Sequence, residues 1–189
     1  MPQLAILLRG LHIFPASSTT ISVSMTLCVT LCRRFFSGFA TRCALLSLFL
    51  LAFKLIFSQI RDILPDTYHQ LELVAEVMPG GQISSQHPFT GMVVNINAHT
   101  LGHRDGKDFL LCIVIPLGNF VGAELCLYEP GLVFPLQNGD LFGFRSFDIT
   151  HFNLPYTGQR GSIVLHSDID ALTWLKDRNN WSHSDYAPN

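Results

Sequence analysis

Six short apolar runs follow one another along the second half of the chain, and turn-forming residues separate them. The runs cover residues 91–97, 109–116, 123–128, 131–136, 140–145 and 161–166. Gly, Pro, Asn and Asp mark the breaks, as in Gly118-Asn119, Glu129-Pro130-Gly131, Asn138-Gly139-Asp140 and Tyr156-Thr157-Gly158. Short strands joined by such turns favour an antiparallel sandwich or a small barrel. The sequence therefore predicts a mainly β domain.

Helices are predicted on both sides of these runs. Pro65 and Asp66 are typical of a first helical turn. The apolar residues that follow repeat at helical spacing, namely Tyr68, Leu71, Val74, Ala75 and Met78. Pro79-Gly80-Gly81 ends this pattern. A second, short helix is predicted after Asp168, where Trp174 and Trp181 would pack it onto the β domain.

The composition changes near residue 60. Residues 1–58 contain no acidic residue and only five basic ones. We therefore divide the chain into an apolar N-terminal extension, residues 1–60, and a domain, residues 61–189, with its core at about 88–181. The apolar stretch at 43–57 begins with eleven apolar or small residues before Lys54, whereas a membrane span needs about 20. A buried helix is favoured there, and membrane contact through 43–57 stays open.

Charge and cysteine usage limit the function classes. The formal net charge is −2, and residues 89–180 contain six basic and nine acidic residues, a net of −3. This balance excludes strong non-specific attraction to nucleic acid as a property of the chain. The five cysteines are odd in number and include no CxxC pair, which favours a reduced, intracellular protein. A nuclear location would follow if nucleic acid were the substrate.

Two histidines and a carboxylate have a spacing that suits a metal ion. His103 and Asp105 are two positions apart, so both would point to one side of a strand. His151 follows Asp105 after 46 positions, which leaves room for about four strands in between. Two imidazoles and one carboxylate are the set with which non-haem Fe(II) oxygenases hold iron on one face. We predict these three residues as metal ligands and as the catalytic centre.

An arginine with suitable neighbours follows the second histidine. On a strand, Arg160 and Ser162 would share a face, where a guanidinium and a hydroxyl can bind the carboxylate of a dicarboxylate cosubstrate. Asn95 and Asn97 share a face of the first predicted strand, and we predict them as further cosubstrate contacts. His166 would lie on the same face as Arg160, and a satisfied histidine at the core or the pocket rim is favoured for it.

At these residues the sequence resembles the 2-oxoglutarate/Fe(II)-dependent dioxygenase superfamily, and more narrowly its fungal TET/JBP-like, transposon-associated members. Three stretches carry the resemblance: PFTGMVVNINAHTLGHRDGKD, GAELCLYEPGLVFPLQNGDLFGFRS and ITHFNLPYTGQRGSIVLHSD. The family's HxD motif falls on His103 and Asp105, its distal histidine on His151, and its cosubstrate arginine on Arg160. The resemblance covers about half of the chain.

The resemblance implies a double-stranded β-helix (jelly roll, cupin-like) with flanking helices. It implies Fe(II) and 2-oxoglutarate as cofactors and dioxygen as co-reactant. It also implies DNA with a modified base, such as 5-methylcytosine, as the partner, and that base would have to be flipped out of the duplex. Two alternatives stay open: a dioxygenase that acts on a substrate other than nucleic acid, and a truncated or inactive jelly-roll remnant without catalysis.

Overall fold

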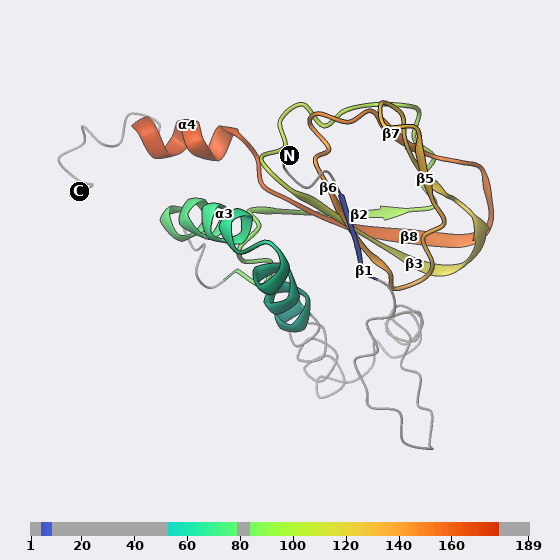
Figure 1. Cartoon of the computed structure of the whole chain (residues 1–189), viewed down its shortest axis with the longest axis horizontal. Coiled ribbons are helices and arrows are strands. Elements are labelled where there is room, and N and C mark those ends of the chain that lie inside the picture. Colours follow the sequence, from blue (N-terminus) through green and yellow to red (C-terminus); the bar gives the residue numbers. More distant parts are fainter. Residues whose placement is uncertain (1–4, 9–52, 79–83, 178–189) are drawn as a thin grey trace, which may run out of the picture.

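The computed structural model describes residues 5–8, 53–78 and 84–177. The described residues form two antiparallel sheets, and helices flank the larger sheet (Figure 1). The five-stranded sheet has the order β1-β6-β3-β8-β2, and the three-stranded sheet has the order β5-β4-β7. The predicted class, mainly β with flanking helices, is confirmed.

The elements have the following bounds. The larger sheet contains β1 (Ala5–Leu8), β6 (Leu141–Phe144), β3 (Cys112–Gly122), β8 (Tyr156–His166) and β2 (Gly91–Ile96). The smaller sheet contains β5 (Leu132–Phe134), β4 (Leu125–Leu127) and β7 (His151–Asn153). The helices are α3 (Pro65–Val77), α4 (Asp170–Asp177) and the helical residues 53–63.

The two faces of the β3–β8 pair belong to two different cores. Because side chains alternate along a strand, one face packs against the helices through Ile113, Ile115, Ile163 and Leu165. The opposite face packs between the sheets through Cys112, Val114 and Val164, together with Leu125 and Leu127 of β4 and Phe142 and Phe144 of β6. Side chains of β8 with even numbers therefore face the gap between the two sheets.

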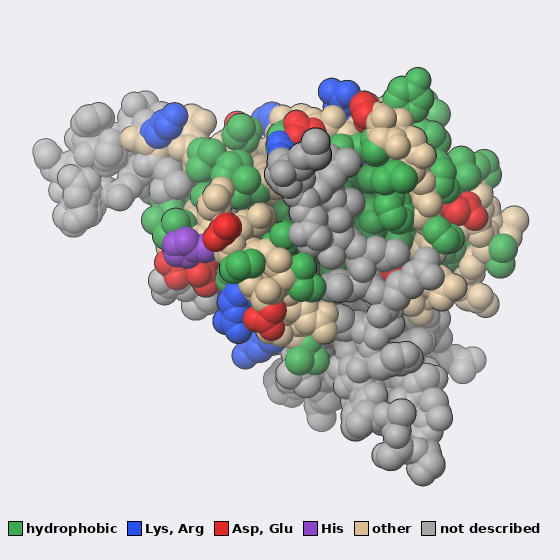
Figure 2. Space-filling model, in the orientation of Figure 1, with side chains coloured by type: hydrophobic (Ala, Val, Ile, Leu, Met, Phe, Trp, Pro, Cys, Tyr) green, Lys and Arg blue, Asp and Glu red, His purple; other side chains and the backbone are tan. Residues whose placement is uncertain are grey.

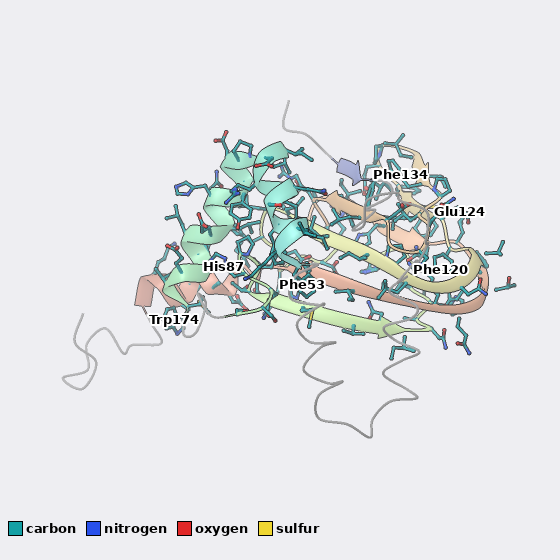
Figure 3. The ribbon with its side chains drawn as sticks, turned by 90° about the horizontal axis from the view of Figure 1, so that it is seen from below. Phe53, His87, Phe120, Glu124, Phe134 and Trp174 are labelled. Atoms are coloured by element: carbon teal, nitrogen blue, oxygen red, sulfur yellow. The ribbon has the colours of Figure 1, made fainter. Side chains whose placement is uncertain are left out.

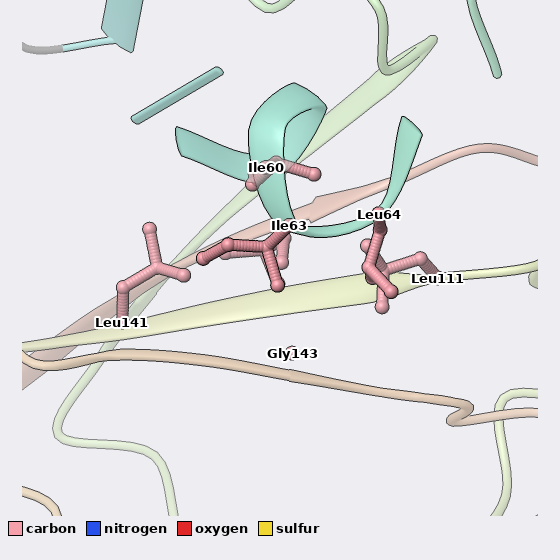
Figure 4. Close-up of a pocket in the computed structure, with 7 residues that line it drawn as sticks. Ile60, Ile63, Leu64, Leu111, Leu141 and Gly143 are labelled. Atoms are coloured by element: carbon pink, nitrogen blue, oxygen red, sulfur yellow. The ribbon is translucent and has the colours of Figure 1, made fainter. Parts of the chain in front are cut away.

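The helical residues 53–63 cover the outer face of the larger sheet (Figure 3). Phe53, Ile56, Phe57 and Ile60 are buried in this core. The predicted division between residues 1–60 and 61–189 therefore runs through a packed core. A small hollow beneath this helix is lined by apolar residues, among them Ile60, Leu111 and Leu141 (Figure 4).

Most of the predicted stretch at 43–57 lies outside the described residues, which begin again at Phe53. Among the helices that are described, none is both long enough and apolar enough to cross a membrane.

Local signals account for the two labelled helices. Pro65 stands in the first turn of α3, and Asp66 adds a negative charge near its N-terminus. The buried residues of α3 are Tyr68, Leu71, Val74 and Ala75, which confirms the predicted helical repeat. A short helix after Asp168 is confirmed as α4. Its main contacts are with α3 rather than with a strand of the β domain.

Four strands were predicted within their bounds, and the ends of the two longest strands were not. β2, β4, β5 and β6 lie within their predicted ranges. The turns predicted at Gly118 and Gly158 are wrong, because β3 and β8 run through them. A Cβ atom on Gly118 would lie 2.2 Å from the carbonyl oxygen of Gln159, and one on Gly158 would lie 2.3 Å from that of Asn119. These glycines let the two backbones come close rather than reverse direction. β7 was not predicted at all.

Candidate metal centre

His103, Asp105 and His151 come together in the folded chain. One ligand atom from each lies within 4.8 Å of the other two. Nε2 of His151 is 3.4 Å from Oδ2 of Asp105, and Nε2 of His103 is 3.7 Å from Oδ1. The four strands β3 to β6 separate Asp105 from His151 along the chain, as the spacing allows. Their role as metal ligands stays a prediction.

Backbone pairing brings the two histidines side by side. The N–H of His151 donates to the carbonyl of His103 at 2.9 Å, and the N–H of His103 donates to the carbonyl of His151 at 3.2 Å. The two residues form an isolated antiparallel bridge, and their ring centroids are 4.4 Å apart. His103 and Asp105 come together without a regular strand, since His103 pairs with His151 in an isolated bridge and the carbonyl of Asp105 accepts a turn hydrogen bond from Asp108.

Both imidazoles are held in the same way. Nδ1 of His103 lies 2.8 Å from the carbonyl oxygen of Leu101, and Nδ1 of His151 lies 3.0 Å from that of Ile149. A carbonyl oxygen only accepts, so each Nδ1 is the donor. This leaves each Nε2 facing the carboxylate of Asp105, the orientation that metal-binding histidines take when their other nitrogen is hydrogen-bonded outside the site.

The carboxylate of Asp105 carries the negative charge of the cluster. The side chain of His151 is the largest cause that lowers the pKa of Asp105, partial burial opposes it, and the charge of His103 lowers it further. Two imidazole nitrogens and an ionised carboxylate on one side of a metal leave coordination positions for a chelating cosubstrate and dioxygen. The donor set therefore fits a divalent iron ion.

Glu129 ties together the residues that flank the three predicted ligands. Its Oε1 accepts hydrogen bonds from Nη2 of Arg104 and from Oγ1 of Thr150, both at 2.6 Å. Its Oε2 accepts from the backbone N–H of Thr150 at 2.7 Å. Arg104 lies between His103 and Asp105, and Thr150 precedes His151. Glu129 thus joins the two segments from outside the cluster.

This network was missed at the sequence level, where Glu129 was assigned only to a turn. Arg104, the residue inside the HxD motif, could have indicated it. An arginine at this position needs an acidic partner, and Glu129 is that partner. The hydrogen bonds from Thr150 and from Arg104 lower the pKa of Glu129 to about 2.

Arg160 is buried on the inner face of β8, and no described residue gives it an anionic partner. Its side chain is 6% exposed, and its Nε has no hydrogen-bond partner among the described residues. The Cζ atom lies 5.6 Å from the ring centroid of Phe120 and 5.8 Å from that of Tyr156. Burial lowers the pKa of the guanidinium, yet arginine stays charged at neutral pH. A buried cation that lacks an anion fits a site for a carboxylate ligand.

Ser162 and Asn95 lie opposite each other in the β2–β8 register. Nδ2 of Asn95 is 3.5 Å from Oγ of Ser162, which is buried on the same face as Arg160. Since Oγ accepts from Asn95, its own proton is available to a carboxylate beside Arg160. Asn97 is exposed, and its Oδ1 accepts from the backbone N–H of Arg160 at 3.0 Å. The contact of Asn97 is therefore with the backbone that carries Arg160.

His166 has a partner on the same inner face. Its Nδ1 lies 3.1 Å from Oδ1 of Asp108, whose Oδ2 accepts a 2.5 Å hydrogen bond from Ser146. Contact with Asp108 raises the pKa of His166. Its ring packs over Gly91, where a Cβ atom would lie 2.5 Å from Nε2. The ion-pair contact agrees with the histidine at the core or the pocket rim that the sequence favours. Nδ1 of His166 makes no hydrogen bond of ordinary geometry with a described residue.

Comparison with known proteins gives low similarity. No protein-family model matches the sequence, and no curated protein matches it. The chain is similar to the solved structure of NgTET1 in complex with 5mC DNA, with 14% sequence identity and a TM-score of 0.49, over 59% of this chain and 50% of that chain. It is also similar to an oxidoreductase of the 2OG-Fe(II) oxygenase family from Burkholderia pseudomallei, with 20% identity and a TM-score of 0.35, over 40% of this chain and 41% of that chain. The chain spans half or less of these proteins, so its function is inferred below from its own site.

We predict that Glu129 titrates near pH 2 in the folded protein. A carboxyl whose pKa is lower in the folded than in the unfolded chain stabilises the fold above the unfolded value of about 4.5, and this contribution is lost as the pH falls through about 2. NMR titration of the Glu129 side-chain carboxyl carbon measures the midpoint. In Thr150→Val the midpoint should rise towards 4.5, because one donor is removed. Thr157→Val, at an exposed threonine of β8, is the matched control. A wild-type midpoint near 4.5 would contradict the network.

Proposed function

We propose that this protein is a dioxygenase dependent on Fe(II) and 2-oxoglutarate, with His103, Asp105 and His151 as the iron ligands. The observation that carries the proposal is the convergence of two Nε2 atoms on one carboxylate, with both Nδ1 atoms hydrogen-bonded away from it. When bound, Fe(II) would supply the dioxygen chemistry that couples decarboxylation of 2-oxoglutarate, to succinate and carbon dioxide, to oxidation of a substrate C–H bond.

Arg160 is the proposed anchor of the cosubstrate. Its guanidinium would bind the distal carboxylate of 2-oxoglutarate in place of the anion that it lacks. Ser162 would donate its hydroxyl proton to the same carboxylate, and Asn95 holds Ser162 from β2. Asn97 holds the backbone of Arg160. Phe120 and Tyr156 flank the guanidinium and keep water from it.

Positioning is the main contribution of the protein to such a reaction. The hydrogen bonds of His103 and His151 to backbone carbonyls fix the direction of each Nε2. Asp105 supplies the one negative charge among the three ligands, which offsets part of the charge of a divalent ion. The cosubstrate carboxylate would lie at Arg160, on the inner face of β8 that also carries Val164 of the core between the sheets.

The finer assignments belong to the same proposal. We propose that the two sheets form a double-stranded β-helix, and that the chain is one of the fungal TET/JBP-like dioxygenases. Its substrate would then be a methylated base in DNA. The three stretches of sequence resemblance support this assignment. The net charge of −3 between residues 89 and 180 favours the alternative, a substrate other than nucleic acid.

We predict that Fe(II) and 2-oxoglutarate, added together without oxygen, give the weak visible charge-transfer band of a chelated iron centre. His151→Ala should abolish the band, because one of three protein ligands is lost. Absorption spectroscopy of the anaerobic mixture measures it, and circular dichroism checks that the variant is folded. Absence of the band from the wild-type protein would overturn the proposal, and a band that persists in His151→Ala would overturn the ligand assignment.

Removal of the anchor should weaken cosubstrate binding selectively. In Arg160→Gln, the 2-oxoglutarate concentration at half-maximal band intensity should rise by about 30-fold or more, since removal of one partner from a buried charge pair costs about 2 kcal/mol or more. Arg145→Gln is the matched control, because Arg145 also lies over a ring, that of Phe147, and already has Asp148 as a partner. Equal effects of the two substitutions would argue against Arg160 as the anchor.

The substrate is tested by comparing nucleic acids under turnover. We predict that succinate formation rises with a methylated DNA strand and that mass spectrometry finds oxidised methylcytosine in it. The same strand without methyl groups is the control. Succinate formed without any oxidised base would remove DNA as the substrate and leave the metal and cosubstrate assignments standing.

A further inference from the structure

We propose that the protein has a second metal site, for Zn²⁺, between α3 and the segment that leads into β2. Its ligands are Glu72, Glu76 and His87. His69, which lies beside Glu72 on the same helix, would turn towards the ion as the fourth donor. One ligand atom from each of Glu72, Glu76 and His87 lies within 4.8 Å of the other two. None of these residues belongs to the iron site, and the proposal does not depend on the function proposed above.

The donors come from two elements that are separated in the chain. Glu72 and Glu76 are one helical turn apart on α3, so their side chains lie on the same face. His69 is on that face as well, with its Nδ1 3.8 Å from Oε2 of Glu72. His87 comes from the loop before β2 and lies beside α3 (Figure 3). Figure 2 shows histidine and acidic side chains next to each other over α3.

The charges at this place are not balanced by basic side chains. Among the described residues, no Lys or Arg lies within ion-pair distance of Glu72 or Glu76, and the ion-pair contact of Glu72 is with His69. Two carboxylates one turn apart repel each other and destabilise a helix. A divalent cation between them would replace this repulsion by attraction. The carboxylates of Glu72 and Glu76 are therefore held close together, and no described Lys or Arg side chain neutralises them.

The kind of donor selects the kind of metal. Ca²⁺ and Mg²⁺ prefer sites made of oxygen donors, whereas this set contains two imidazoles and two carboxylates. Zn²⁺ accepts histidine nitrogen and carboxylate oxygen in tetrahedral sites, and four protein ligands are typical of a closed, structural site. The half-buried and exposed side chains of Glu72, Glu76 and His87 are free to close around the ion. Bound zinc would fasten α3 to the start of β2, the strand that carries Asn95.

The test counts zinc ions and removes the two sites separately. In a background with His103→Ala and Asp105→Asn, the iron site is disabled while the buried His151 remains in place. We expect this protein to bind one Zn²⁺ by native mass spectrometry and to gain thermal stability from zinc. Adding Glu76→Gln or His87→Ala should lower the zinc affinity by about tenfold or more. Removing a residue that only supports a metal ligand already costs about tenfold, and these two residues are proposed as ligands themselves.

Asp62→Asn in the same background is the matched control, because Asp62 is an exposed helical carboxylate outside the group. It should leave zinc affinity unchanged, and competition with a chelator measures the affinity of each variant. Two results would overturn the proposal: no zinc bound by the background protein, or the same affinity after both Glu76→Gln and His87→Ala. All three surface substitutions spare the core, and circular dichroism confirms that each variant is folded.

Discussion

Two backbone hydrogen bonds between His103 and His151 determine the geometry of the candidate site. In an antiparallel pair that exchanges both bonds, the two side chains lie on the same side of the ladder. The two imidazoles are therefore neighbours wherever this bridge forms, and the carboxylate two residues after His103 can reach both. His103 is outside the regular strands, so the bridge provides the backbone pairing between the irregular segment around residue 103 and β7.

Hydrogen bonds around this bridge hold it in place. Glu129 binds Arg104 on one side and Thr150 on the other, so one carboxylate restrains both segments that carry the ligands. The ring of His151 also lies 4.8 Å from that of Phe144, which belongs to the core between the sheets. The candidate site thus has an apolar support on the inside and a polar network on the outside, an arrangement that would hold the proposed ligands in place before a metal binds.

The parts that were predictable from sequence are those that local chemistry determines. The apolar repeat of α3 and the turn-forming residues around β4, β5 and β6 can be recognised without reference to the rest of the chain. Gly118 and Gly158 misled the prediction because glycine marks a turn and a close approach of strands equally well, and only the pairing of β3 with β8 decides between them. The candidate ligands and their order along the chain could be predicted from the sequence. The bridge between His103 and His151 and the role of Glu129 could not, because they depend on segments that meet only in the folded chain.

The buried guanidinium of Arg160 lowers the stability of the fold. Its guanidinium is nearly buried and faces two rings at 5.6 and 5.8 Å, contacts that contribute about 0.5–2 kcal/mol each at most. Burying a charge without a partner costs several kcal/mol, so the rings offset only part of it. A carboxylate bound there would satisfy the charge and stabilise the folded chain by mass action. The inner face of β8 is apolar at Val164 and cationic at Arg160, so the proposed cosubstrate site begins where the packed core ends.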